Sequence, residues 1–220
     1  RKDTLIYSKK TVVGISDISY KKKYIALSKV EFEKAYVHLY SDSLKNMNIT
    51  YIIDNLTDTA DTASSRWIIM FKQVGLKNSA FRLDDYYKTK QDTGVNFSDM
   101  FLDSLNIRIK NMMISNGKLY CNINKLCFQE QSGFRLKSLT GKMTIKSSCL
   151  HFDNLKIETD RSNIEAYMLY FDFAKFGDFK YIENKVDIDA KIKKSSCSMA
   201  DISMFATSLY GMNSIFEVSG

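Results

Sequence analysis

The stretch Leu119–Ala166, LYCNINKLCFQEQSGFRLKSLTGKMTIKSSCLHFDNLKIETDRSNIEA, contains one short pattern twice. With φ for an apolar residue and x for any residue, the pattern is φxφxxφxφ. Its two copies here are Cys121–Phe128 and Leu150–Ile157, and two more copies are Ile25–Phe32 and Ile69–Leu76. Four copies predict a β-building unit that the chain uses repeatedly.

Each half of the pattern has period two, which predicts a strand with one buried face, since successive side chains point to opposite sides of a sheet. The added central residue would turn the second half onto the wrong face, so a bulge, kink or strand break must absorb it. We therefore expect Asn124-Lys125 and Asp153-Asn154 to lie at bulges or strand breaks, which would bend the sheet.

The composition is that of a folded chain, with 220 residues, 45% hydrophobic residues, 26% charged residues and no proline. The net charge of +7 comes mainly from lysines that alternate with apolar residues, as expected for the solvent face of a sheet. Lys21–Lys23 is expected at a solvated hairpin tip, with a phosphate or anionic-lipid contact as the alternative. The aromatic residues lie mostly in the apolar phase of the strands, which argues against nucleic-acid binding.

Short strands with close turns predict antiparallel pairing between residues 105 and 173, where Asn116-Gly117 is the strongest hairpin signal. Residues 11–18 read as a weak strand broken at Gly14, and residues 186–192 as a cleanly alternating strand. Short helices are expected at 48–56, 97–101, 176–181 and 198–209, the last with Ser198 as its cap, and loops near 57–65 and 84–96. The predicted fold is mainly β: one elongated region over residues 1–220, with a long, curved, mostly antiparallel sheet that forms a groove or an open sandwich, and a few short amphipathic helices.

No sequence motif for catalysis, nucleotide binding or metal binding is present, so we expect no enzyme activity, no cofactor and no metal. His38 and His151 are expected to be surface residues without a carboxylate partner. Asp84-Asp85 is interpreted as solubilising. The four cysteines lack CxxC spacing, and Cys121 is expected to be a buried free thiol.

The chain is rich in large apolar residues, with 14 Phe, 13 Tyr and 10 Met. Either two sheets bury them against each other in a closed, ligand-free binding or scaffold domain, or a curved sheet presents them to an apolar ligand. Composition leaves both alternatives open. The candidate residues for such a groove are the in-phase positions of the four copies: Leu27, Val30, Phe32, Phe71, Val74, Leu76, Ile123, Leu126, Phe128, Phe152, Leu155 and Ile157.

The order and spacing of three features resemble the AsmA-like/TamB family of envelope proteins, particularly its Bacteroidota-type members. These features are Leu126–Phe134 (LCFQEQSGF), the strand Leu150–Ile157 followed by Thr159-x-x-Ser162, and the opening DTLIYSKKTVVGISDISYKKKYIALSKVEFEKAYVHLY. They are strand patterns rather than a chemical signature, and the resemblance covers most of the chain.

The resemblance implies a long curved "β-taco" with an apolar interior, in the periplasm and anchored to the inner membrane by an upstream segment. A chain that begins Arg-Lys-Asp fits a piece of a longer protein, cut at both ends. The implied function is transport of phospholipid acyl chains between inner and outer membranes, or support of outer-membrane protein assembly. The implied partners are a phospholipid and, through regions outside this piece, an Omp85-type outer-membrane barrel.

Overall fold

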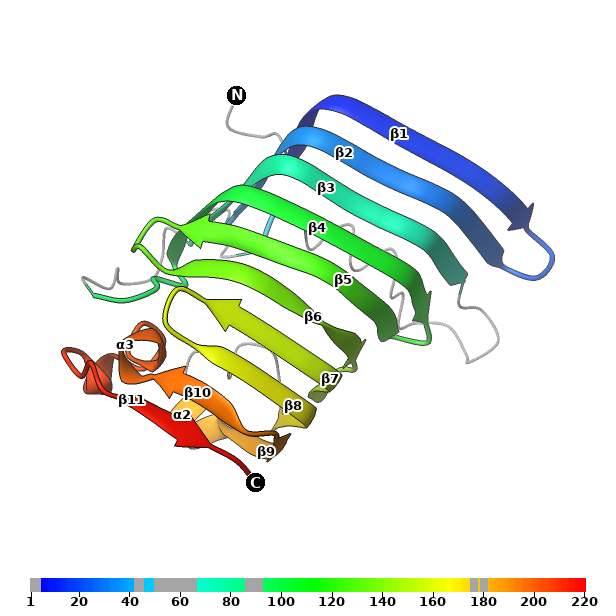
Figure 1. Cartoon of the computed structure of the whole chain (residues 1–220). Helices are drawn as coiled ribbons and strands as arrows, with labels where there is room; N and C mark the ends of the chain where they lie inside the picture. The colour runs from blue at the N-terminus through cyan, green and yellow to red at the C-terminus, as the bar shows by residue number, and fades with distance from the viewer. Residues whose placement is uncertain (1–4, 42–45, 50–66, 86–92, 175–177, 179–181) are drawn as a thin grey trace.

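The computed structural model describes residues 5–41, 46–49, 67–85, 93–174, 178 and 182–220, apart from the side chains of residues 183 and 207. Over these residues the chain forms one open, curved sheet of 11 strands (Figure 1). The strands are β1 (Ile6–Ser19), β2 (Tyr24–Tyr40), β3 (Ile68–Asp84), β4 (Asp99–Ser115), β5 (Lys118–Glu130), β6 (Arg135–Ile145), β7 (Cys149–Thr159), β8 (Asn163–Phe173), β9 (Val186–Ile192), β10 (Ser195–Ser198) and β11 (Ile215–Val218). The predicted curved, mainly antiparallel β fold is confirmed.

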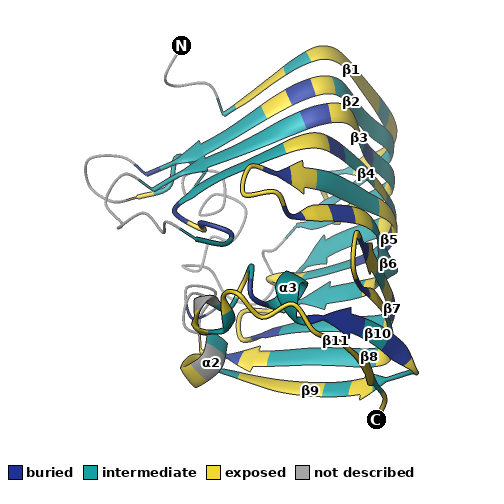
Figure 2. Ribbon diagram, turned by 60° about the vertical axis from the view of Figure 1, so that its left-hand side comes forward, coloured by how far each residue is buried: buried dark blue, intermediate teal, exposed yellow. Residues whose placement is uncertain are grey.

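The strands β1 to β8 lie side by side in chain order, and β8 then pairs with both β9 and β10. Every described pairing of these strands is antiparallel except that of β2 with β3, which is parallel. Figure 2 shows the sheet curving around an open side that contains α3 (Met199–Ile202). The side that faces α3 is therefore the concave side.

The first two copies of the repeated pattern pair directly with each other across β2 and β3. Leu27 lies opposite Phe71, Val30 opposite Val74, and Phe32 opposite Leu76. A parallel pair without any offset brings the same position of each copy together. The two copies are therefore neighbours in one sheet as well as repeats in the sequence.

The central steps of the third and fourth copies lie at bulges, as predicted. Asn124-Lys125 of β5 lies opposite the single residue Thr140 of β6, since Ile123 pairs with Gly141 and Leu126 with Leu139. Asn154 of β7 has a positive φ of 49° at a second bulge, against β6. Bulges bend a strand and increase its twist, so they contribute to the curvature of the sheet.

The first two copies absorb the central step differently. On β2, Ser28 is an extra residue relative to β1, where Gly14 pairs with Lys29 and Ile15 with Leu27. A Cβ atom on Gly14 would lie 2.5 Å from Ser28 Oγ, so glycine provides the room for this bulge. The expectation that Gly14 breaks the strand is wrong, because β1 continues through it. The second copy pairs in register with both of its neighbours.

A second line of irregular backbone crosses β2, β3 and β4. Lys34, Asn78 and Ser104 have φ values of 51°, 46° and 53°, and the first two occupy matching positions of the parallel pair. Left-handed backbone is uncommon outside glycine and marks turns and kinks. The strands change direction in this region, as Figure 1 shows for the left-hand part of β1 to β4.

The hairpin expectations are confirmed. Residues 20–23 form the turn between β1 and β2, and Asn116-Gly117 forms the turn between β4 and β5 with φ values of 51° and 66°. Positive φ at both central residues is typical of a type I′ turn, which favours Asn-Gly because its twist matches that of the strands. Residues 186–192 form β9, as predicted.

The helix expectations are only partly confirmed. The helix predicted at 97–101 is wrong, because Asp99 and Met100 pair with Asp84 and Leu83 as the first residues of β4. Tertiary strand pairing overrides the local helical spacing there. At 198–209 only the four residues of α3 and the 3-10 helix Thr207–Leu209 form, and Ser198 makes no side-chain capping bond. A further four-residue helix, α2, spans Ile182–Lys185, and the segments 50–56, 57–65, 86–92 and most of 176–181 lie outside the described residues.

Candidate functional site

The concave face of the sheet carries rows of apolar side chains that run across the strands. Residues paired directly across strands share a face, so each row can be followed from strand to strand. One row crosses β1 to β9 without a polar residue: Ile18, Ile25, Ile69, Ile114, Leu119, Ile145, Leu150, Phe171 and Ile188. Another crosses β2 to β8: Phe32, Leu76, Ile107, Leu126, Leu139, Ile157 and Ile164. We call the face formed by these rows the apolar face.

The predicted groove residues lie in these rows or between them. Val30, Val74, Ile109 and Ile123 form a row across β2 to β5. Phe152 joins Met143 and Leu169 in a further row, and Leu155 pairs with Ala166. The structure thus brings residues from four separate copies onto one surface, although whether they contact a ligand stays a prediction.

Several members of the same rows lie outside the predicted set of groove residues. The missed residues are on β4, β6 and β8, and they include Ile107, Ile109, Leu139, Met143, Ile164 and Leu169. Residues 107–114 of β4 fit φxφxxφxφ, and so do residues 164–171 of β8 if Ala166 counts as apolar, but neither stretch was counted among the four copies. On β6 only shorter φxφ pairs occur. The shorter φxφ signal would have found Ile107, Ile109 and Met143.

The apolar face is only partly covered. Ile123 and Leu155 are 7% and 2% exposed, whereas most other row residues on β2 to β8 are half-buried. At the β1 edge Ile15 and Ile18 are largely exposed, and so is Ile188 on β9. A sheet packed against a second sheet would bury the whole face, so the described part of this molecule is not a closed sandwich.

The opposite face carries ion pairs among charged side chains, beside a mixed row of Ala26, Met70, Met113 and Tyr120. Lys29 Nζ lies 2.9 Å from Glu31 Oε2, and Lys77 Nζ lies 3.5 Å from the same oxygen. The hydrogen bond from Lys29, aided by the charges of Lys29 and Lys77, holds the pKa of Glu31 below its usual range. Lys156 of β7 and Lys193, which follows β9, flank Glu165 of β8 in the same way. The charged clusters of the sheet thus lie on this face and not in the apolar rows.

One end of the apolar face is capped by the chain itself. Val95, Phe134 and Leu136 are buried in a cluster with half-buried residues of the rows and with Met204. The rings of Phe134 and Phe205 meet edge to face at 4.9 Å, and Val95 N–H donates to the Met204 carbonyl at 2.7 Å. This cap, formed by residues 93–98 and 199–205, covers the row that begins at Phe32 where that row crosses β5 to β7.

The cap is attached through Asp201 of α3. The hydroxyls of Thr159 and Ser162, at the β7–β8 turn, donate to Asp201 Oδ2 at 2.5 Å and 2.6 Å. Ser162 Oγ also accepts from the Ser198 backbone N–H at 3.0 Å. Thr159, Ser162 and Ser198 are buried, so these bonds are shielded from water.

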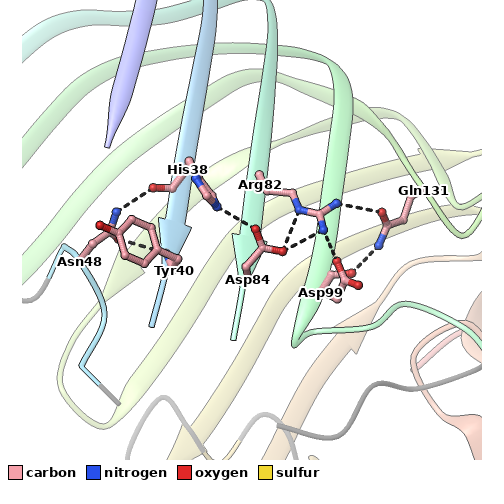
Figure 3. Close-up of polar contacts among 7 residues, drawn as sticks. All are labelled: His38, Tyr40, Asn48, Arg82, Asp84, Asp99 and Gln131. Atoms are coloured by element: carbon pink, nitrogen blue, oxygen red, sulfur yellow. Dashed lines mark hydrogen bonds and ion pairs between the residues drawn. The ribbon is translucent and has the colours of Figure 1, made fainter. Parts of the chain in front are cut away.

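A polar network lies where β2, β3 and β4 end (Figure 3). His38 Nε2 lies 2.7 Å from Asp84 Oδ2, and Arg82 Nε donates to Asp84 Oδ1 at 2.9 Å. Arg82 also pairs with Asp99, and Gln131 contacts both Arg82 and Asp99. Partial burial alone would raise the pKa of Asp84, but the hydrogen bonds from Arg82 and His38 outweigh burial and lower it.

This network corrects the expectation of two surface histidines without carboxylate partners. The His38 side chain is 15% exposed and paired with Asp84, which is 46 residues away in the sequence. His151 is half-buried, with Nε2 3.3 Å from Asp153 Oδ1. Asp84, interpreted as solubilising, is instead the centre of a structural network.

Within the described residues, no three or more His, Cys, Asp and Glu side chains are grouped so that they could hold a metal ion. The helices in the same part of the chain are all too short or too polar to cross a membrane. In comparisons with protein-family models, curated proteins and solved structures, none matches this chain.

Proposed function

We propose that the apolar face binds the acyl chains of lipids. The observation that carries the proposal is the continuity of the apolar rows across as many as nine strands, on a concave surface that the described residues leave partly exposed. Exposed apolar surface of this extent marks a ligand or interaction site in a soluble domain. Rows that cross every strand from β1 to β9 suit a long ligand better than a compact one.

The driving force for such binding is the hydrophobic effect. Burying one CH₂ group contributes about 0.8 kcal/mol, so the binding free energy of an acyl chain becomes more favourable with each methylene that leaves water. The half-buried side chains of the rows lose their remaining contact with water at the same time. The charged opposite face keeps the sheet soluble while one face carries the lipid.

On this proposal, together with the resemblance to the AsmA-like/TamB family, the chain is a non-catalytic segment of an envelope protein in the periplasm. It provides a surface along which phospholipids pass between the inner and outer membranes. A role in outer-membrane protein assembly, alongside an Omp85-type barrel, follows from the same resemblance.

A ligand-free scaffold domain is the second candidate, and the cap favours it. Around Phe134 and Phe205, the chain's own side chains cover the part of one apolar row that crosses β5 to β7. If the remaining rows were covered in the same manner, the face would be an ordinary core. The two functions therefore differ in whether lipid reaches the uncapped rows.

Site-specific photo-crosslinking tests the proposal. A benzophenone amino acid at Phe71 or Phe152, on the apolar face, is expected to crosslink co-purifying or added phospholipid. The matched control is the same probe at Lys72, the neighbouring exposed residue on the opposite face. Lipid adducts detected by mass spectrometry at 71 and 152 but not at 72 support the proposal. No adduct at any position, or equal adducts at 71 and 72, would leave the scaffold alternative.

A further inference from the structure

Three hairpin turns lie along one edge of the sheet, and the charged residues within these turns are all basic. They are the turns β1–β2 (residues 20–23), β4–β5 (115–118) and β6–β7 (146–148), on the right in Figure 1. They contain Lys21, Lys22, Lys23, Lys118 and Lys146, and no Asp or Glu. The third turn has an acidic neighbour in Asp172, because Phe173 N–H donates to the Ser148 carbonyl at 3.0 Å. We call these three turns the basic end.

The basic end also presents aromatic residues. Tyr20 is 84% exposed, the highest value among the large apolar residues of the described chain. Its ring meets the ring of Trp67, which precedes β3, edge to face at 5.4 Å. Tyrosine and tryptophan next to lysines are typical of protein surfaces at the boundary between water and the lipid headgroups, because their rings are apolar and their tips polar.

The opposite end of the sheet carries charges of both signs. Asp85 and Asp160 lie there together with Arg135 and Arg161, and Asp160 pairs with Lys137 at 3.2 Å. The network of Arg82 with Asp84 and Asp99 lies at the same end. The three turns of the basic end, which contain only basic charges, therefore differ from the turns at the opposite end, where acidic and basic side chains are mixed.

We propose that the basic end docks on an anionic lipid bilayer. Lysines close to an anionic membrane are attracted by its surface potential, and Tyr20 and Trp67 would enter the headgroup layer. Ile18, at the end of the longest apolar row, immediately precedes this end, so docking brings the apolar face to the membrane. That the membrane then supplies acyl chains to the apolar face rests on the proposed function. Docking itself is a separate property.

The single tryptophan of the chain makes docking directly measurable. Vesicles of phosphatidylcholine mixed with phosphatidylglycerol are expected to shift Trp67 emission to shorter wavelength, and pure phosphatidylcholine vesicles to have little effect. Each lysine contributes about fivefold to the partition coefficient, so Lys21→Ala with Lys22→Ala lowers it about 25-fold. The matched control is Lys125→Ala with Lys142→Ala, which removes the same charge from exposed mid-strand positions.

Four results would overturn the inference. The control pair could lower the partition coefficient as much as the Lys21/Lys22 pair, or the emission of Trp67 could stay at the same wavelength when anionic vesicles are added. Vesicle binding could be unchanged between 0.01 M and 1 M salt, or duplex DNA could displace the protein from the vesicles as strongly as anionic vesicles bind it. Screening lengths of about 30 Å and about 3 Å at these salt concentrations make a docked lysine cluster strongly salt-dependent. A variant of the apolar face, Val74→Asp, separates the two proposals. It is expected to lose lipid crosslinking and to keep vesicle binding, whereas loss of vesicle binding as well would contradict a docking site confined to the basic end.

Discussion

Val30 of β2 and Val74 of β3 lie directly opposite each other in a parallel pair, at the same position of two copies of φxφxxφxφ. Val74 is also paired with Ile109 of β4, which in turn lies opposite Ile123 of β5. The row therefore extends from the second copy to the third through β4, whose residues 107–114 also fit φxφxxφxφ although they were not among the four predicted copies. Val74 is half-buried within this row, so a substitution there tests the apolar face most directly.

Val74→Asp is expected to abolish most lipid crosslinking at Phe71 while the protein remains folded. A bound acyl chain would have to desolvate the new carboxylate, at a cost of about 1–3 kcal/mol, which lowers lipid occupancy roughly tenfold. Occupancy is measured by mass spectrometry of lipid that co-purifies with the protein. Asn124→Asp adds the same charge at an exposed bulge position and should leave occupancy unchanged. Equal loss in both variants would contradict lipid binding on the apolar face.

Asp201→Ala is expected to release the cap from the apolar face. Thr159 and Ser162 would lose a shared buried acceptor, at a cost of about 1–3 kcal/mol in the free energy of unfolding. Amide hydrogen exchange at Val95, whose N–H donates to Met204, should then become faster.

The control for this prediction is Asp160→Ala in the β7–β8 turn, next to Thr159. Asp160 is exposed and pairs with Lys137 at 3.2 Å, and such a surface pair contributes about 0–1 kcal/mol. Its removal should leave exchange at Val95 unchanged. Unaltered protection of Val95 in Asp201→Ala would show that the aromatic contacts of the cap suffice without the carboxylate.

The network around Asp84 is expected to make folding stability sensitive to acid. Its pKa in the folded chain lies below the ordinary value of 3.8, because the bonds from Arg82 and His38 outweigh the effect of burial. Ionised Asp84 therefore contributes stability at pH values above 3.8, and this contribution is lost as the pH falls through the lower folded-state pKa.

Urea unfolding as a function of acid pH measures this contribution. Asp84→Asn should have a lower unfolding free energy than the native chain above the ordinary carboxyl pKa, and the difference should shrink on acidification. Asp189→Asn, at an exposed position of β9, should follow the native profile. A constant difference at every pH would mean that the ionisation of Asp84 does not matter.

The cysteines are expected to react with iodoacetamide at very different rates. Burial raises the pKa of Cys121 to about 11, so at neutral pH about one molecule in ten thousand carries its thiolate. Cys149 and Cys197 are also buried, whereas Cys127 is half-buried. Peptide mapping should show modification of Cys127 first, with the other three labelled only after unfolding. Early labelling of Cys121 would contradict its placement in the sheet.

The strands, their bulges and the nature of their faces could be predicted from the sequence. Alternation of apolar and polar residues is a local property, because neighbouring side chains point to opposite sides of a strand. The two-residue step in φxφxxφxφ predicts a bulge for the same local reason, which Ser28, Asn124-Lys125 and Asn154 confirm, whereas the second copy pairs without a bulge. The buried thiol of Cys121 follows from its place in that pattern.

Which strands become neighbours was decided by the tertiary structure. The parallel pairing of β2 with β3, the apolar rows, and the bond between His38 and Asp84 all join residues that are far apart in the sequence. Local spacing carries no information on such contacts, and near Met100 it even indicated a helix where pairing with β3 makes a strand. The sequence by itself therefore determined which side of each strand is apolar, whereas only long-range hydrogen bonding and packing decided that these sides form one continuous, partly capped surface.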